Sequence, residues 1–147
     1  MEAPAITLVI DASVGVTLVV SERQSAWAQR LLLDHPPPLV PGIFWTECAN
    51  AFWRMRRAPR SGAKRIDAMA HLALLRLVPV RVAEASSDAA ERALHLGIRL
   101  DHPVYDCLYL ALALDRDAAL ATADLRFAAA IRRAGLLPLD RLLTPPA

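Results

Sequence analysis

Short apolar runs alternate along this chain with longer segments in which apolar residues recur at helical spacing. The first run, residues 6–10, has almost no polar alternation, which is typical of a strand covered on both faces. Similar short runs predict further strands at 39–41, 77–82, 118–123 and 137–139. The character of the first run favours a parallel sheet with helices on both of its sides.

The segments between the predicted strands have helical spacing and helix boundary signals. We expect helices after Asp11, from Ser21 to Asp34, from Ile43 to Arg57, up to Leu75, from Ser86 or Ser87 to Gly97, from Pro103 to Leu114, and from Asp124 to Gly135. Strands that alternate with helices predict an α/β fold, here a three-layer α/β/α sandwich with a mainly parallel central sheet. We expect a single domain over residues 1–143 and a loose tail over 144–147.

Composition narrows the class of protein. The 147 residues are 55% hydrophobic and 22% charged, which is typical of a globular domain and not of a disordered chain. No apolar stretch approaches the ~18 residues of a membrane span, and the N-terminus has no signal-peptide pattern, so we expect a cytoplasmic protein. Cys48 and Cys107 are isolated and are expected in the core. A net charge of only +2 means that any contact with nucleic acid needs a local basic patch.

Two acidic residues directly follow predicted strands. Asp11 comes after the first strand, and Asp124 comes after the strand at 118–123. Ligands in open α/β sheets gather outside the carboxyl ends of the strands, so both side chains should lie at one edge of the sheet. Taken singly, each aspartate is explained equally well as the N-cap of the following helix.

Two further acids stand on predicted helices. Asp106 lies in a segment, 104–112, that is apolar around most of its circumference and should therefore be buried. A buried carboxylate must pair with a cation, bind a metal or become neutral. For Asp106, the alternatives to a metal are a buried arginine and the positive end of the helix near its first turn. Glu47 shares a helix face with Asn50 and Arg54, a stripe that simple solvent exposure would also explain.

The four acids together predict a metal site. Carboxylates that crowd together repel one another unless a cation lies between them. Oxygen ligands without a matching histidine or cysteine cluster favour Mg²⁺ or Mn²⁺ over zinc. None of the four histidines has metal-binding spacing, although His102 stands one helical turn before Asp106 and could orient it.

Several segments resemble, in order and spacing, the motifs of PIN domains, with the closest likeness to the VapC-type ribonuclease toxins of VapBC toxin–antitoxin pairs. They are Val9-Ile10-Asp11-Ala12-Ser13, Thr46-Glu47-x-x-Asn50, Tyr105-Asp106-x-x-Tyr109-Leu110-Ala111-Leu112-Ala113 and Thr122-Ala123-Asp124. The resemblance implies a compact α/β/α sandwich that hydrolyses RNA with Mg²⁺ or Mn²⁺, and that pairs with an antitoxin and forms a homodimer. The resemblance assigns four residues to the acidic quartet of the family, namely Asp11, Glu47, Asp106 and Asp124. It assigns three more to supporting polar positions, namely Ser13, Asn50 and Thr122.

A basic stretch follows Glu47 on the same predicted helix and continues past the helix end. It contains Arg54, Arg56, Arg57, Arg60, Lys64 and Arg65. The first four are candidates for contact with RNA phosphates or with an acidic segment of an antitoxin, and a solvated helix end is an equal alternative. The aromatic residues of this helix, Trp45, Phe52 and Trp53, fit core packing first and a partner groove or dimer contact second.

Three functions are consistent with these patterns. The first is a metal-dependent endoribonuclease toxin, and the second is a nuclease of the same fold that processes RNA without a toxin role. The third is a non-catalytic α/β regulatory module of the phospho-receiver kind. Such a module needs adjacent acids after its first strand and a lysine after its last, whereas this chain has Asp11-Ala12-Ser13 and only one lysine, Lys64.

Overall fold

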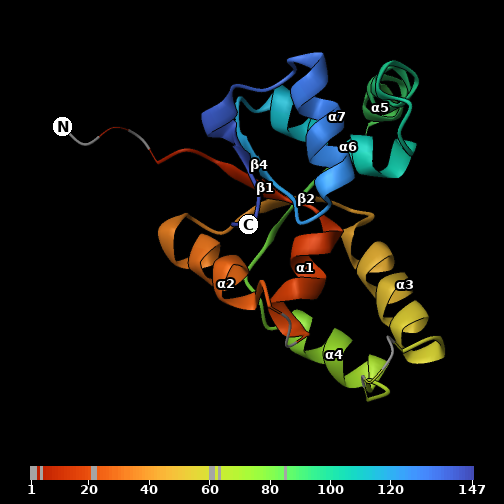
Figure 1. The fold of residues 1–147 in the computed structure, drawn as a ribbon. Coiled ribbons are helices and arrows are strands. Elements are labelled where there is room, and N and C mark those ends of the chain that lie inside the picture. Colours follow the sequence, from red (N-terminus) through yellow and green to blue (C-terminus); the bar gives the residue numbers. More distant parts are fainter. Residues whose placement is uncertain (1–2, 4, 21–22, 60–61, 63, 85) are drawn as a thin grey trace.

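The computed structural model describes residues 3, 5–20, 23–59, 62, 64–84 and 86–147 (Figure 1). Within these residues a wholly parallel five-stranded sheet has the strand order β3-β2-β1-β4-β5. The strands are β1 (Leu8–Ile10), β2 (Leu39–Pro41), β3 (Arg81–Ala83), β4 (Ala119–Ala121) and β5 (Leu142–Leu143). In the register of the sheet, Val9 stands opposite Leu39 on one side and Leu120 on the other.

Helices cover both faces of this sheet. They are α1 (Ala12–Val19), α2 (Ser25–Asp34), α3 (Phe44–Arg57), α4 (Ala68–Leu75), α5 (Ser87–Leu100), α6 (Val104–Asp115) and α7 (Leu125–Ala134). Figure 1 shows α1 to α4 on one side of the sheet and α5 to α7 on the other. The predicted α/β/α sandwich is therefore confirmed, and its sheet is entirely parallel.

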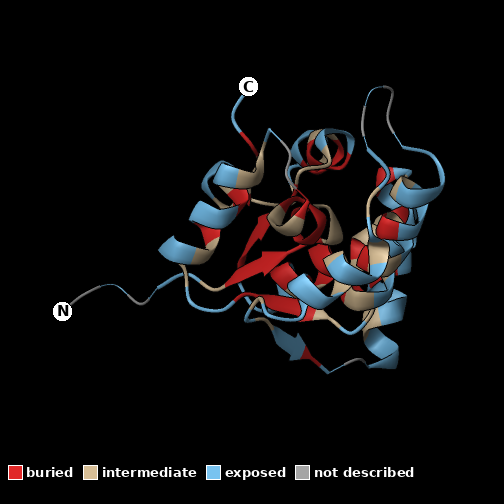
Figure 2. Ribbon diagram, turned by 90° about the horizontal axis from the view of Figure 1, so that it is seen from below, coloured by how far each residue is buried: buried red, intermediate tan, exposed pale blue. Residues whose placement is uncertain are grey.

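The core lies along the two central strands. All residues of β1 and β4 are buried, as the red strands of Figure 2 show. Phe44 and Phe52 from α3 and Phe127 from α7 belong to the core cluster, and each is fully buried. The apolar run at the start of the chain thus forms the doubly covered strand that its pattern predicts.

The last predicted strand, at 137–139, is wrong. Leu139–Arg141 instead form a 3₁₀ turn, and β5 begins at Leu142. Pro138 has no N–H to donate to a neighbouring strand, and the Leu139 side chain is 80% exposed. Leu142 is buried and pairs with Leu120 of β4, so the strand forms where its apolar side chain reaches the core.

The strand predicted at 77–82 is shorter and begins later than its apolar pattern indicates. The backbone amides of Leu77 and Val78 donate to carbonyl oxygens at the end of α4, so these residues extend the helix end as a turn. Only Arg81–Ala83 pair with β2. The apolar pattern therefore identified the segment that contains the strand, but it did not identify which residues of the segment pair with β2.

The helix boundaries differ from the predictions in small ways. Pro103 is the N-cap of α6 and not its first helical residue. The start expected for the second helix, Ser21 and Glu22, lies outside the described residues, and α2 begins at Ser25.

In the tail, Arg132 of α7 donates to the Thr144 hydroxyl at 3.2 Å and Pro145 is buried, while Pro146 and Ala147 are exposed.

Among the described parts of the chain, every helix is too short or too polar to cross a lipid bilayer.

Helices α1 and α3 approach closely at Gly15. A Cβ atom at this position would lie 2.7 Å from Phe44 Cζ and 2.9 Å from Cys48 Sγ, and both of these side chains are fully buried. We expect Gly15→Ala to lower the free energy of unfolding by about 1–2 kcal/mol, because overpacking outweighs the helix propensity of alanine. Urea denaturation measures this change. Gly42→Ala is the control, since a Cβ there meets nothing within 4 Å; equal losses in both variants would contradict the packing argument.

Candidate metal centre

The strand order reverses between β1 and β4, and this is where an open α/β sheet forms a ligand crevice. Asp11 follows β1 directly and is the N-cap of α1, where its Oδ1 accepts from the Val14 amide at 3.1 Å. Asp124 follows β4 and is the N-cap of α7, accepting from the amides of Arg126 and Phe127 at 2.9 and 3.1 Å. Both aspartates therefore cap a helix and, at the same time, lie at the crevice.

Asp11 is the most deeply buried of the acids, with 3% of its surface exposed. The hydroxyls of Ser13 and Thr122 both donate to its carboxylate. Burial raises the pKa of Asp11 from 3.8 to about 6, and these hydrogen bonds oppose the rise. The same hydroxyls accept from the amides of Ala123 and Asp124 at 2.9 and 3.0 Å, so they tie the ends of β1 and β4 together.

Asp106 stands in the first turn of α6 beside a histidine. His102 Nε2 lies 2.7 Å from Asp106 Oδ2, and the His102 ring stacks on Phe127 with centroids 4.6 Å apart. Burial raises the pKa of Asp106, His102 lowers it, and the charge of Asp124 raises it again. The turn before α6 passes close to α5 at Gly97, where a Cβ would lie 3.0 Å from the His102 carbonyl oxygen.

Glu47 comes from α3, on the opposite side of the sheet from α6, and it is half-buried. The hydroxyl of Tyr109, which is itself fully buried, donates to Glu47 Oε1 at 2.7 Å. Burial raises the pKa of Glu47 despite this bond, the charge of Asp106 adds to the rise, and Arg54 opposes it. The Glu47 carboxylate thus turns inward, whereas Asn50 and Arg54 of the same stripe are exposed to solvent.

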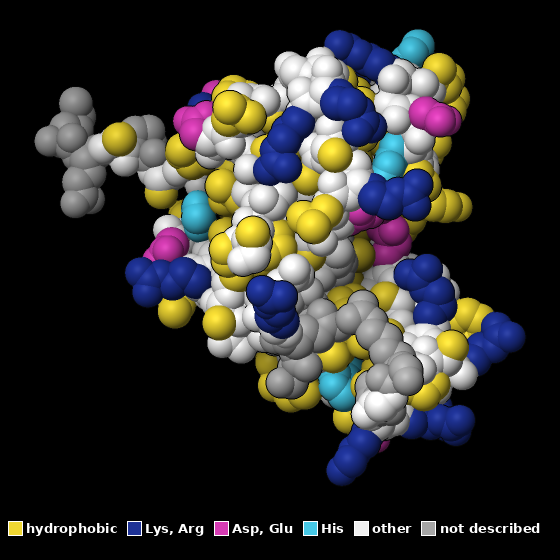
Figure 3. All heavy atoms as spheres, viewed as in Figure 1, with side chains coloured by type: hydrophobic (Ala, Val, Ile, Leu, Met, Phe, Trp, Pro, Cys, Tyr) yellow, Lys and Arg dark blue, Asp and Glu magenta, His cyan; other side chains and the backbone are white. Residues whose placement is uncertain are grey.

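Three of the four acids, Glu47, Asp106 and Asp124, line one cleft of about 660 Å³, and the buried Asp11 contacts its wall through Ser13. Its lining includes Ser13, Glu47, Asn50, Arg54, Asp106 and Asp124. Figure 3 shows acidic side chains in a hollow with basic side chains on both sides of it. Among the described residues, none of the four predicted acids forms an ion pair with an arginine. The acids are therefore not neutralised by arginine ion pairs, although the charge of Arg54 lowers the pKa of Glu47.

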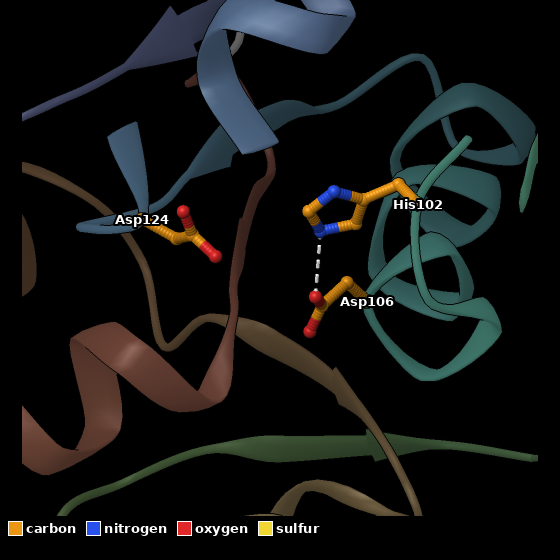
Figure 4. A group of neighbouring side chains, drawn as sticks. All are labelled: His102, Asp106 and Asp124. Carbon is orange, nitrogen blue, oxygen red and sulfur yellow. Dashed lines mark hydrogen bonds and ion pairs between the residues drawn. The ribbon is translucent and has the colours of Figure 1, made fainter. Parts of the chain in front are cut away.

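Two acids of this cleft, together with His102, which lines another cavity, could hold a metal ion. One ligand atom each from His102, Asp106 and Asp124 lies within 4.8 Å of the others, and Figure 4 shows how the three groups gather between α6, β4 and α7. Two carboxylates and one imidazole are a donor set that suits a divalent cation. Asp11 and Glu47 lie outside this tight group, although the charge of Asp106 raises the pKa of each.

The chain matches a known protein family in sequence. The profile of the PIN domain matches residues 8–142. The chain belongs to the PIN domain family. No curated protein matches it in sequence.

Solved structures of VapC toxins and of toxin–antitoxin complexes share the fold of this PIN domain. VapC20 of Mycobacterium tuberculosis, described as a sarcin-ricin loop cleaving toxin, is 21% identical over 84% of this chain and 95% of its own, with a TM-score of 0.61. A toxin–antitoxin complex from Klebsiella pneumoniae shows 20% identity over 95% and 98%, with a TM-score of 0.58. VapBC2 from Rickettsia felis, bound to a promoter DNA fragment, shows 13% identity over 96% and 100%, with a TM-score of 0.64.

Sequence reasoning predicted most of the polar residues that line this cleft, but it missed the place of His102 beside Asp124 and the contact between Tyr109 and Glu47. His102 was expected at most to orient Asp106, and its i, i+4 spacing from that residue was the available signal. The bond between Tyr109 and Glu47 joins positions 62 residues apart, and no local pattern marks it. Of the predicted basic contacts, Arg54 lines the cleft, Arg56 and Arg57 line a neighbouring cavity, and Arg60 lies outside the described residues.

The raised pKa of Asp11 predicts how the stability of the metal-free PIN domain depends on pH. Because its pKa is about 6 in the folded chain and 3.8 ordinarily, the folded state binds more protons between these values. The free energy of unfolding should therefore fall as the pH rises from about 4 to about 7. We expect Asp11→Asn, which can still cap α1, to flatten this fall and to stabilise the domain at neutral pH by about 1–3 kcal/mol.

Urea denaturation over a pH series in a chelator tests this expectation. Glu84→Gln, a change of equal charge at an exposed position, should leave the pH dependence as it is in the native chain. An Asp11→Asn variant with the native pH slope, or with lower stability at neutral pH, would contradict the argument.

Proposed function

We propose that this PIN domain is a Mg²⁺- or Mn²⁺-dependent endoribonuclease and the toxin of a toxin–antitoxin pair. The observation that supports the proposal is the position of Glu47, Asp106 and Asp124 in one cleft at the β1–β4 crevice, without an arginine ion pair among the described residues. Asp11 is buried beside this cleft, and Ser13, which lines the cleft, donates to its carboxylate. Charge crowded in this way favours a divalent cation, and carboxylate oxygens favour Mg²⁺ or Mn²⁺.

In this proposal Asp106 and Asp124 hold the metal, and Asp11 and Glu47 complete the acidic quartet. A bound Mg²⁺ or Mn²⁺ would lower the pKa of an attacking water and offset the charge that develops on the phosphate. Ser13 and Thr122 hold the Asp11 carboxylate at the strand end. Tyr109 holds Glu47 in the same way from α6.

The side chains that line the rest of the cleft would bind the substrate. Asn50 and Arg54 stand on the same side of α3 as Glu47 and line the cleft with it. An amide and a guanidinium there can donate to phosphate or ribose oxygens. The cleft would thus hold one phosphodiester beside the acids, and hydrolysis would leave a 5′-phosphate and a 3′-hydroxyl.

Removal of single cleft charges tests the nuclease directly. We expect Asp124→Asn to lower RNA cleavage by at least about 100-fold, because the metal loses a ligand, while asparagine still caps α7. Cleavage of labelled RNA with Mg²⁺ or Mn²⁺ measures the loss, and circular dichroism confirms the fold. Glu91→Gln should cleave at the native rate. Native activity of Asp124→Asn, or of the native chain in excess chelator, would refute the proposal.

His102 is proposed as a positioning residue that holds Asp106 for the metal. Loss of a hydrogen bond that orients a metal ligand typically lowers metal affinity by about 10–100-fold. His102→Ala should therefore weaken Mn²⁺ binding by about that factor. His102→Gln keeps a side-chain N–H and should restore part of the affinity. Electron paramagnetic resonance of Mn²⁺ measures binding without any cleavage. Unchanged affinity in the alanine variant would contradict the role, and a nitrogen coupling to Mn²⁺ would make His102 a direct ligand instead.

The toxin role is supported by what the similar structures contain. The Klebsiella pneumoniae structure is a toxin–antitoxin complex, and the Rickettsia felis structure is VapBC2 with promoter DNA. By analogy we propose an antitoxin partner, a homodimer and a cytoplasmic place of action for this chain. Growth arrest on expression, relieved by Asp124→Asn and by the product of a short adjacent gene, supports a toxin. Cleavage of RNA without growth arrest favours a processing nuclease.

A further inference from the structure

A buried glycine stands in the last turn of α5, beside the start of α6. Glycine inside a helix is destabilising compared with alanine, so Gly97 calls for an explanation. A Cβ atom at this position would lie 3.0 Å from the His102 carbonyl oxygen and 3.2 Å from Val104 Cγ2. The carbonyl oxygen belongs to the backbone and cannot turn aside as a side chain can. The absence of a side chain at Gly97 therefore lets the segment that leads into α6 pass close to α5.

The chain reverses directly after this close approach. Asp101 ends α5 in the left-handed region, with φ 49° and ψ 51°, where glycine is favoured and a β-branched residue is strained. The backbone amides of Asp101 and His102 both donate to the Gly97 carbonyl oxygen, the second at 3.1 Å. Gly97 and Asp101 thus fix the backbone of His102 relative to the end of α5.

The His102 side chain is held at its ring face and at Nε2. The ring stacks on the fully buried Phe127, with centroids 4.6 Å apart and planes 18° apart. Nε2 lies 2.7 Å from Asp106 Oδ2, and Figure 4 shows it turned toward that carboxylate, with Asp124 facing the pair. The amide of Phe127 in turn donates to Asp124 Oδ1 at 3.1 Å. Phe127 therefore relates the imidazole to both acids.

This arrangement leaves little room for displacement of His102. Hydrogen bonds from nitrogen to oxygen weaken beyond about 3.2 Å, so a shift of about half an ångström would remove most of the contact with Asp106. A Cβ atom at Gly97 requires the His102 carbonyl to give way by a comparable amount. Because Phe127 is packed in the core, the ring cannot follow by moving deeper.

Close packing of α5 on α6 would also explain a glycine at this position. However, the nearest atom to a Cβ there belongs to the His102 backbone and not to α6, which begins at Val104. The amides of the turn also converge on the Gly97 carbonyl oxygen. The two explanations differ in what they predict, because packing alone affects stability and leaves the imidazole where it is.

We propose that Gly97 and Asp101 are positioning residues that set the His102 imidazole against Asp106 and thereby tune the affinity of the metal centre. Both act through the backbone of His102, and neither belongs to the group formed by His102, Asp106 and Asp124. This inference rests on the proposed function for the metal, whereas the contact between His102 and Asp106 can be measured without one.

Electron paramagnetic resonance of Mn²⁺ tests this role with side chains of increasing size. We expect Gly97→Ala to weaken Mn²⁺ binding by about 3- to 10-fold and Gly97→Val by about 10- to 100-fold, the range for loss of an orienting contact. Ala93→Val is the matched control, since Ala93 is fully buried one helical turn earlier on the same face of α5. Its overpacking should lower stability and leave Mn²⁺ affinity unchanged.

Two further comparisons show whether the effect passes through His102. Residues that act as a unit are not additive, so Gly97→Ala should cause no further loss of Mn²⁺ affinity in a His102→Ala background. Asp101→Gly and Asp101→Val remove the same charge, but only valine opposes the left-handed backbone. The valine variant should therefore bind Mn²⁺ about 3- to 10-fold more weakly than the glycine variant.

Nitrogen-15 NMR of the histidine imidazoles in a chelator measures the contact without a metal. The Nε2 signal of His102 should report a hydrogen bond in the native chain and in Ala93→Val. It should move toward the value of an unbonded imidazole in Gly97→Val and in Asp101→Val. Circular dichroism confirms the fold of each variant, and the Asp101 pair decides the matter if valine at Gly97 prevents folding.

The outcomes separate this inference from the nuclease proposal. Native Mn²⁺ affinity in the folded Gly97 variants, an equal loss in Ala93→Val, or a full further loss in the double variant would overturn the inference. An unchanged His102 signal in Gly97→Val would overturn it too, because the glycine would then act elsewhere. A His102 signal that depends on Gly97 in a chain that binds no Mn²⁺ would support the positioning role while the nuclease proposal fails.

Discussion

Repulsion among carboxylates in one partly desolvated cleft is the constraint on which the rest of this structure depends. The charge of Asp106 raises the pKa of Asp11 and of Glu47, and the charge of Asp124 raises that of Asp106. Burial acts in the same direction on Asp11, Glu47 and Asp106. A chain that gathers acids in this way stores electrostatic energy that a divalent cation can release.

The fold withstands that repulsion because each acid is held by donors from a rigid element. Ser13 and Thr122 donate to Asp11 across the ends of adjacent strands, and backbone amides of α7 donate to Asp124. His102, in the turn before α6, contacts Asp106, and Tyr109 of α6 donates to Glu47. These bonds orient the carboxylates before any ion arrives, so a metal would enter a site that is already formed.

Helix α3 connects the core, the cleft and the surface because its faces differ. Phe52 anchors one face in the core, Glu47 and Asn50 line the cleft from another, and Trp53 stands on the solvent side. A helix fixed so firmly by its aromatic residues gives the cleft a rigid wall.

Local sequence patterns determined the elements and the residue types of this PIN domain. The run before Asp11 predicted a doubly covered strand, and the strand-end positions of Asp11 and Asp124 predicted their common edge, because parallel strands end on the same side. The apolar surroundings of Asp106 predicted a buried carboxylate, but the side chain is 31% exposed because the first turn of α6 lies at the cleft. Each of these inferences needed only neighbours in the chain.

Tertiary structure alone decided which side chains touch. The strand order placed β1 beside β4, and the packing of the layers brought Tyr109 to Glu47 and His102 near Asp124. It also decided that the last strand begins at Leu142, where the core accepts an apolar side chain. Periodicity reports the face on which a residue lies, but contacts between distant segments depend on how the layers pack, and that packing is a property of the whole chain.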